Sequence, residues 1–87
     1  MDVRMNAGYI ITDSIHIGET EFVIGMSVSA PAQFVTWECK DGNNYYWGHY
    51  LYERMAAERD LLDRAAKELE FKEQRQAKKP KEQERER

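Results

Sequence analysis

The sequence predicts an α+β fold: a four-stranded antiparallel sheet of two β-hairpins, followed by one long C-terminal helix packed on one face of the sheet. Two stretches, 9–28 and 34–50, each hold two runs of strand-forming residues separated by a turn signal. From about Leu51 the apolar period changes from two residues to roughly 3.6. The chain has 87 residues, which is enough for one domain.

The first predicted hairpin turns at Gly18-Glu19, a glycine-first pair that suits a type II′ turn. This turn places Ile15 opposite Phe22, so that the apolar side chains of both strands lie on the same side of the sheet. A slip of one residue would put them on opposite sides. The turn type and the apolar pattern therefore predict the same register.

The second predicted hairpin joins strands 34–40 and 45–50 through a turn centred on Gly42-Asn43. This register pairs Glu38 with Trp47 and Trp37 with Gly48. It divides the hairpin into two faces. One face carries Val35, Trp37, Cys39, Tyr46 and Tyr50, and the other carries Phe34, Thr36, Glu38, Lys40, Tyr45, Trp47 and His49. The first face is the natural core side; the alternatives are that the helix covers the second face, or that a dimer covers both.

The second face provides the candidate partner site, formed by Tyr45, Trp47 and His49 with Glu38 at the rim. Tryptophan and tyrosine are enriched where binding energy concentrates, because they bring a large contact area with few rotors to immobilise. If the first face is the core, these aromatic side chains remain available to a protein partner.

The predicted helix carries its apolar residues on one stripe, interrupted by Glu58: Leu51, Met55, Leu62, Ala65 and Leu69. We expect this stripe to pack on the sheet and the helix to continue past Gln76. Around this single domain, assigned to 8–77, we expect a flexible leader over 1–7. Residues 78–87 have no apolar side chain and are expected to form a disordered charged tail.

The charge distribution disfavours a nucleic-acid partner, and the apolar pattern gives no sign of a membrane partner. Residues 1–50 carry two basic and six acidic side chains, a net charge of −4, so binding to a phosphate backbone is disfavoured. The N-terminus does not read as a secretory signal, and no apolar run approaches the ~20 residues that span a bilayer. We therefore expect a cytoplasmic protein with no membrane partner.

The sequence offers little support for catalysis, a metal or a cofactor. The single cysteine, Cys39, cannot form an intramolecular disulfide or a cysteine-type zinc site. Two histidines, His16 and His49, lie on different predicted hairpins, and the proposed register places Cys39 and His49 on opposite faces. We predict no catalytic residue, no metal ligand and no cofactor.

A distinctive run links these elements: TEFVIG, a proline-containing connection, FVTWECKDGNNYYWGHY, and a helix rich in Ala, Leu, Glu and Arg. Over about residues 8–70 it resembles a group of small accessory proteins, without known activity, of conjugative and other mobile elements of gut bacteria. The resemblance implies an accessory protein that modifies a host defence or regulatory system. It carries over no functional residues.

Three functional hypotheses follow from these observations. The first is a non-enzymatic protein-binding accessory module that uses the aromatic face of the second hairpin; a second copy of the chain is a further candidate partner. The second is an inhibitor of a host nucleic-acid-processing defence complex, in the manner of anti-CRISPR proteins. The third is a small-ligand-binding domain or small enzyme, which needs a concave pocket with convergent polar groups.

Overall fold

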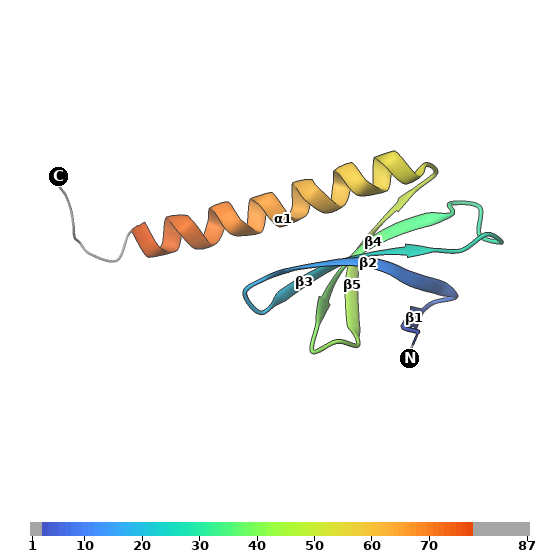
Figure 1. Ribbon diagram of the computed structural model, residues 1–87, viewed down its shortest axis with the longest axis horizontal. Helices are drawn as coiled ribbons and strands as arrows, with labels where there is room; N and C mark the ends of the chain where they lie inside the picture. The colour runs from blue at the N-terminus through green and yellow to red at the C-terminus, as the bar shows by residue number, and fades with distance from the viewer. Residues whose placement is uncertain (1–2, 78–87) are drawn as a thin grey trace.

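The computed structural model describes residues 3–77 and confirms an α+β fold, with a C-terminal helix lying against an antiparallel sheet (Figure 1). The sheet has five strands in chain order: β1 (Met5–Asn6), β2 (Tyr9–Ile17), β3 (Thr20–Met26), β4 (Phe34–Lys40) and β5 (Asn44–Leu51). The helix, α1, covers Arg54–Ala77. Residues 78–87, where we expected a disordered tail, lie outside the described part. No helix within residues 3–77 is long and apolar enough to cross a membrane.

The predicted number of four strands is wrong because Met5–Asn6, assigned to the flexible leader, form β1 and pair with the start of β2. Ala7 and Gly8 connect the two strands with positive φ angles of 52° and 84°. Two successive positive φ angles are typical of the type I′ turns that close two-residue hairpins. The strand was missed because two residues are too short to show an alternating pattern.

The β2–β3 hairpin has the predicted register near its turn, with Ile15 opposite Phe22. Gly18 has a φ of 62°, as the first central residue of a type II′ turn requires. A bulge at Thr12 then shifts the pairing, so that Ile11 lies opposite Gly25. A bulge increases the local twist of a strand, and the sheet curls into a half-barrel.

Two apolar cores lie on opposite faces of β3, whose five central residues are all buried. Between the sheet and α1 the buried residues are Phe22, Ile24, Ala57, Leu61 and Ala65. On the other face they are Tyr9, Val23, Val35, Trp37 and Cys39. The curl brings β2 and β5 together over this second core although they are not neighbouring strands: the rings of Tyr9 and Tyr50 lie 6.2 Å apart.

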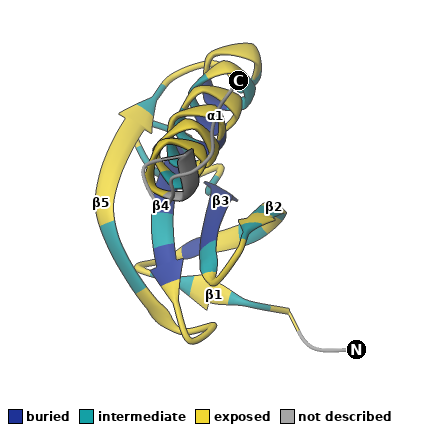
Figure 2. Ribbon diagram, turned by 90° about the vertical axis from the view of Figure 1, so that its left-hand side faces the viewer, coloured by how far each residue is buried: buried dark blue, intermediate teal, exposed yellow. Residues whose placement is uncertain are grey.

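The helix covers the face of the sheet that holds Phe22 and Thr36. In the second hairpin this is the second face, so the helix takes the alternative position and not the one on the natural core side. Viewed along α1, its buried side faces β3 and β4 (Figure 2). The predicted packing stripe is wrong for Met55, Leu62 and Leu69, which are exposed. Small side chains at the actual contact allow the helix to approach the sheet closely, and the large apolar side chains point away from it.

Candidate interaction surface

The loop of the β4–β5 hairpin is one residue shorter than predicted, so that Lys40 pairs with Asn44. Asp41 and Gly42 have φ angles of 59° and 80°, and the Asn43 amide donates to the Lys40 carbonyl at 3.4 Å, so the tight turn is built on Asp41-Gly42 and not on Gly42-Asn43. Cys39 consequently lies opposite Tyr45. This shift of one residue moves Tyr45 to the face opposite the one we predicted.

A β-bulge in β5 restores the predicted register farther along the hairpin. Trp47 and Gly48 together lie opposite Trp37, and beyond them Thr36 pairs with His49 as predicted. Trp47 has a φ of 55°. This left-handed backbone conformation is unfavourable for a bulky side chain, so neighbouring contacts must hold it.

The four predicted site residues do not share one face. Tyr45 packs against Trp37 on the face away from the helix, with ring centroids 5.5 Å apart. Glu38 and His49 lie on the helix side, where each bonds to another side chain, and Trp47 projects into solvent with 69% of its surface exposed. The prediction of a single aromatic patch is wrong because the bulge reverses the alternation of side chains within β5.

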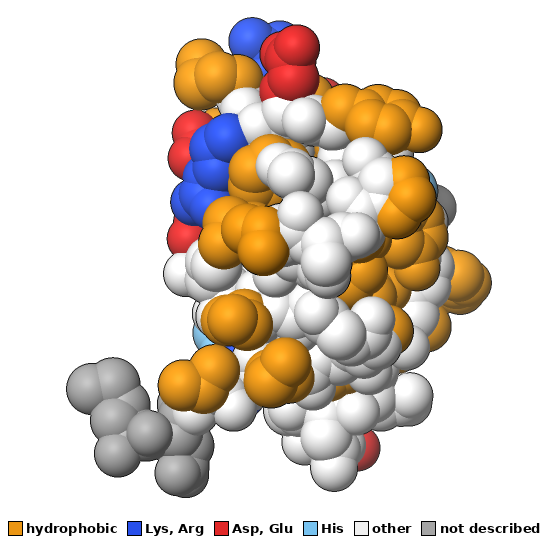
Figure 3. Space-filling view, turned by 90° about the vertical axis from the view of Figure 1, so that its right-hand side faces the viewer, with side chains coloured by type: hydrophobic (Ala, Val, Ile, Leu, Met, Phe, Trp, Pro, Cys, Tyr) orange, Lys and Arg blue, Asp and Glu red, His pale blue; other side chains and the backbone are white. Residues whose placement is uncertain are grey.

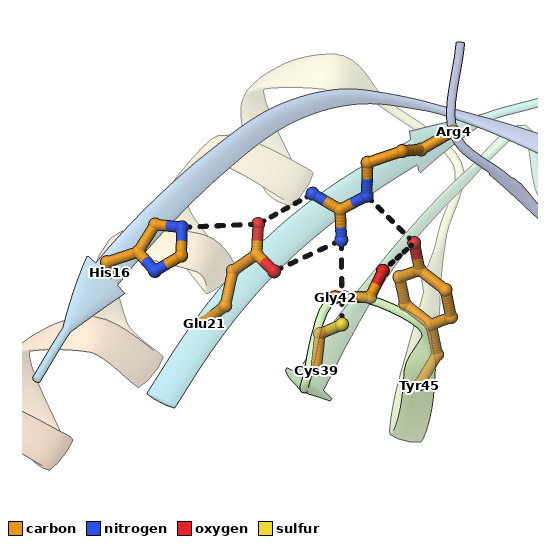
Figure 4. Close-up of polar contacts among 6 residues, drawn as sticks. All are labelled: Arg4, His16, Glu21, Cys39, Gly42 and Tyr45. Carbon is orange, nitrogen blue, oxygen red and sulfur yellow. Dashed lines mark hydrogen bonds and ion pairs between the residues drawn. The ribbon is translucent and has the colours of Figure 1, made fainter. Parts of the chain in front are cut away.

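The hydroxyl of Tyr45 takes part in a polar network across the mouth of the curled sheet (Figure 4). Arg4 donates to it from Nε at 3.1 Å, and its two Nη atoms donate to the Glu21 carboxylate at 2.8 and 3.1 Å. His16 lies 3.5 Å from the same carboxylate. Hydrogen bonds from Arg4 outweigh the effect of burial and hold the pKa of Glu21 below its usual value. The network ties the N-terminal edge of the sheet to β5.

A second polar cluster fixes the bulge from the helix side. Arg64 donates from Nη2 to the Trp47 carbonyl at 2.8 Å, and from Nη1 to the carbonyl and hydroxyl of Thr36 at 3.1 and 3.0 Å. Asp60 accepts a hydrogen bond from the Thr36 hydroxyl and lies 2.9 Å from Nδ1 of His49. One helical arginine thus bridges β4 to the bulged carbonyl of β5.

The ionisation of Asp60 supports this arrangement. Burial alone would raise the pKa of its carboxyl group, but the hydrogen bonds from Thr36 and His49, together with the charge of Arg64, outweigh burial and lower the pKa. Asp60 is therefore a carboxylate at neutral pH. Its negative charge lies near Arg64, the cation that donates to the Trp47 carbonyl, and so helps to hold the bulge in place.

Three exposed aromatic residues lie along β5 and directly after its end, and we call Trp47, Tyr50 and Tyr52 the aromatic edge. All three are more than half exposed. β5 is the last strand of the sheet, and most of its length is open to solvent (Figure 2). Seen from the opposite side, hydrophobic side chains are exposed on both margins of the molecule (Figure 3). The sequence pattern had assigned Tyr50 to the core face.

The structure offers less to the small-ligand and enzyme hypotheses. An open groove of about 480 Å³ lies between the β2–β3 turn, β4 and the C-terminal part of α1, where Glu19, Glu38 and Lys72 mix opposite charges. Cys39 and His49 lie on opposite faces of the sheet, and burial raises the pKa of the Cys39 thiol. Among residues 3–77 no three side chains of His, Cys, Asp or Glu group as metal ligands.

No family model, curated protein or solved structure matches this chain. The resemblance to accessory proteins of mobile elements therefore stays a prediction. The features of the structure that bear on function are the aromatic edge and the polar cluster that supports the bulge at Trp47.

Proposed function

We propose that the protein is a non-enzymatic protein-binding module that anchors its partner through Trp47. The observation that carries the proposal is an indole that is mostly exposed and held on a left-handed backbone residue. That conformation costs roughly 1–2 kcal/mol in a residue with a side chain. Strain of this kind persists where surrounding contacts enforce it, as Arg64 does here, and it concentrates at functional positions.

Side-chain insertion explains the geometry better than addition of a partner strand. A free edge strand can template pairing with another chain, but a bulge twists the edge and interrupts its row of donors and acceptors. The bulge at Trp47 divides β5 near its middle. We therefore infer that the partner receives the indole in an apolar pocket and contacts Tyr50 and Tyr52 around it.

The resemblance to mobile-element proteins supports a cytoplasmic host protein as the partner. The narrower form of the proposal is an inhibitor of a host nucleic-acid-processing defence complex. It is tested by adding the purified protein to such complexes and measuring target cleavage. Cleavage that is unaffected across several effector types would remove this narrower form and leave the binding module to be tested separately.

The direct test captures proteins from host cytosol on three immobilised baits: the wild-type chain, Trp47→Gly and Phe71→Ala. Phe71 is a matched control, since it is also an exposed aromatic residue but lies on α1. We expect one partner to be retained by the wild type and by Phe71→Ala and lost from Trp47→Gly, and the purified partner to bind the bait directly. Equal retention by all three baits would refute the role of Trp47.

A further inference from the structure

The outer side of α1 carries an apolar stripe that nothing covers within the described part of the chain. Met55, Leu62 and Leu69 are spaced seven residues apart and are 48–75% exposed, and Ala66 lies between the last two. We call these four residues the outer stripe. They lie roughly a third of a turn around the helix from the residues that pack on the sheet, Ala57, Leu61 and Ala65. A seven-residue apolar repeat is the spacing at which one helix packs along another.

The stripe already contains a receptor site for a side chain from a second helix. Met55, Glu58, Arg59 and Leu62 surround a shallow hollow on the exposed side of α1. These residues stand at positions i, i+3, i+4 and i+7, which is the four-residue hole that accepts a knob in helix pairs. A leucine from a facing helix has the shape and polarity to occupy it.

The charges along the stripe indicate which helix packs on it and in which direction that helix runs. Arg59 lies near the N-terminal end of the stripe and Glu73 near its C-terminal end, and both are exposed. We propose that a second copy of this chain pairs with α1 in antiparallel orientation. Leu69 of each copy then enters the hollow of the other, which places Arg59 of each copy about one helical turn from Glu73 of the other, within reach of these two long side chains. A parallel pair would instead set Arg59 against Arg59 and Glu73 against Glu73.

The dimensions indicate a reversible dimer. A helix of 24 residues is about 36 Å long, so the whole stripe can be covered. One helix face nevertheless offers less than the roughly 800 Å² per partner of a standard interface. We therefore expect an equilibrium between one and two chains that depends on concentration. The pairing goes beyond the proposed function and does not depend on it, since the stripe faces away from the sheet and leaves Trp47 free.

Sedimentation equilibrium of the full chain over a wide concentration range tests the pairing. The wild type should move from the mass of one chain to that of two, and Leu62→Asp and Leu69→Asp should each raise the dissociation constant roughly tenfold or more. Phe71→Asp, an equally exposed position off the stripe, should behave as the wild type. A wild type that stays monomeric throughout, or leucine variants that dimerise normally, would overturn the proposal; the first result would leave the stripe to a helix of another protein.

Charge reversal tests the direction of the helices. Arg59→Glu should weaken the dimer by about threefold to tenfold, because each of two ion pairs becomes a repulsion. Adding Glu73→Arg in the same chain should restore the wild-type dissociation constant. In a parallel pair Arg59→Glu would not weaken association and the double variant would restore nothing, and either result would overturn the antiparallel arrangement. Circular dichroism checks that each variant keeps its helix.

Discussion

Replacing Trp47 with glycine or with alanine should reverse the usual order of stability of these two residues in a strand. Both substitutions remove the same indole and its contact with Tyr46, whose ring centroid lies 5.0 Å away. They differ in the backbone, because alanine keeps the penalty of a left-handed conformation and glycine does not. Because Trp47 has a φ of 55°, the glycine variant should be more stable than the alanine variant.

The size of the difference follows from two opposing terms. A left-handed residue with a Cβ atom costs roughly 1–2 kcal/mol, and glycine in an ordinary strand is disfavoured by about 0.5–1 kcal/mol relative to alanine. We expect Trp47→Gly to be more stable than Trp47→Ala by about 0.5–1 kcal/mol. In a domain of this size, that difference raises the melting temperature by about 2–8 °C. Tyr50 provides the control, since it lies in the same strand without a positive φ.

Thermal and urea unfolding of four variants measure this difference: glycine and alanine at position 47, and glycine and alanine at position 50. At position 50 alanine should be the more stable, as in any regular strand. If alanine is also the more stable at position 47, the left-handed bulge does not exist in solution. Trp47 would then not be a positioned anchor.

Three further variants test the support of the bulge. Arg64→Met removes the donor to the Trp47 carbonyl and should lower the free energy of unfolding by about 2 kcal/mol, which chemical denaturation measures. The folded pKa of Asp60 lies below its unfolded value, so the contribution of Asp60 to stability is complete at neutral pH and is lost as the pH falls through the folded pKa. Asp60→Asn removes this titration and should therefore flatten the acid side of the pH–stability profile. Gly48→Ala would place a Cβ 2.8 Å from Nε1 of the buried Trp37 and should cost about 1–3 kcal/mol in thermal unfolding, whereas equal stability would show that the indole does not lie there.

The sequence was sufficient to predict the fold class and the first hairpin, because the period of the apolar residues and the glycine-first turn at Gly18 are local signals. They agree on the pairing of Ile15 with Phe22. β1 was missed because the pairing of so short a strand depends on the turn at Ala7, a residue type that does not indicate a positive φ.

The candidate site was predicted in part. Trp47 was identified by its residue type, but its αL backbone depends on Arg64, which is distant in sequence, and no local pattern predicts such a bulge. The same bulge separates Tyr45 from His49. The helix was rotated from its expected position because Thr36, on the sheet, offers polar partners to Asp60 and Arg64, a preference that the hydrophobic pattern alone does not contain.

Titration of the captured partner into wild-type protein and into Trp47→Gly tests the central claim most directly. Glycine adopts the left-handed conformation of residue 47 without strain. A loss of binding in Trp47→Gly could therefore not be attributed to a strained or unfolded β5. A central tryptophan anchor is worth about 2 kcal/mol or more, which corresponds to a rise in Kd of roughly thirtyfold. We predict at least that rise with an intact melting transition. An unchanged Kd would contradict the claim that this indole holds the partner.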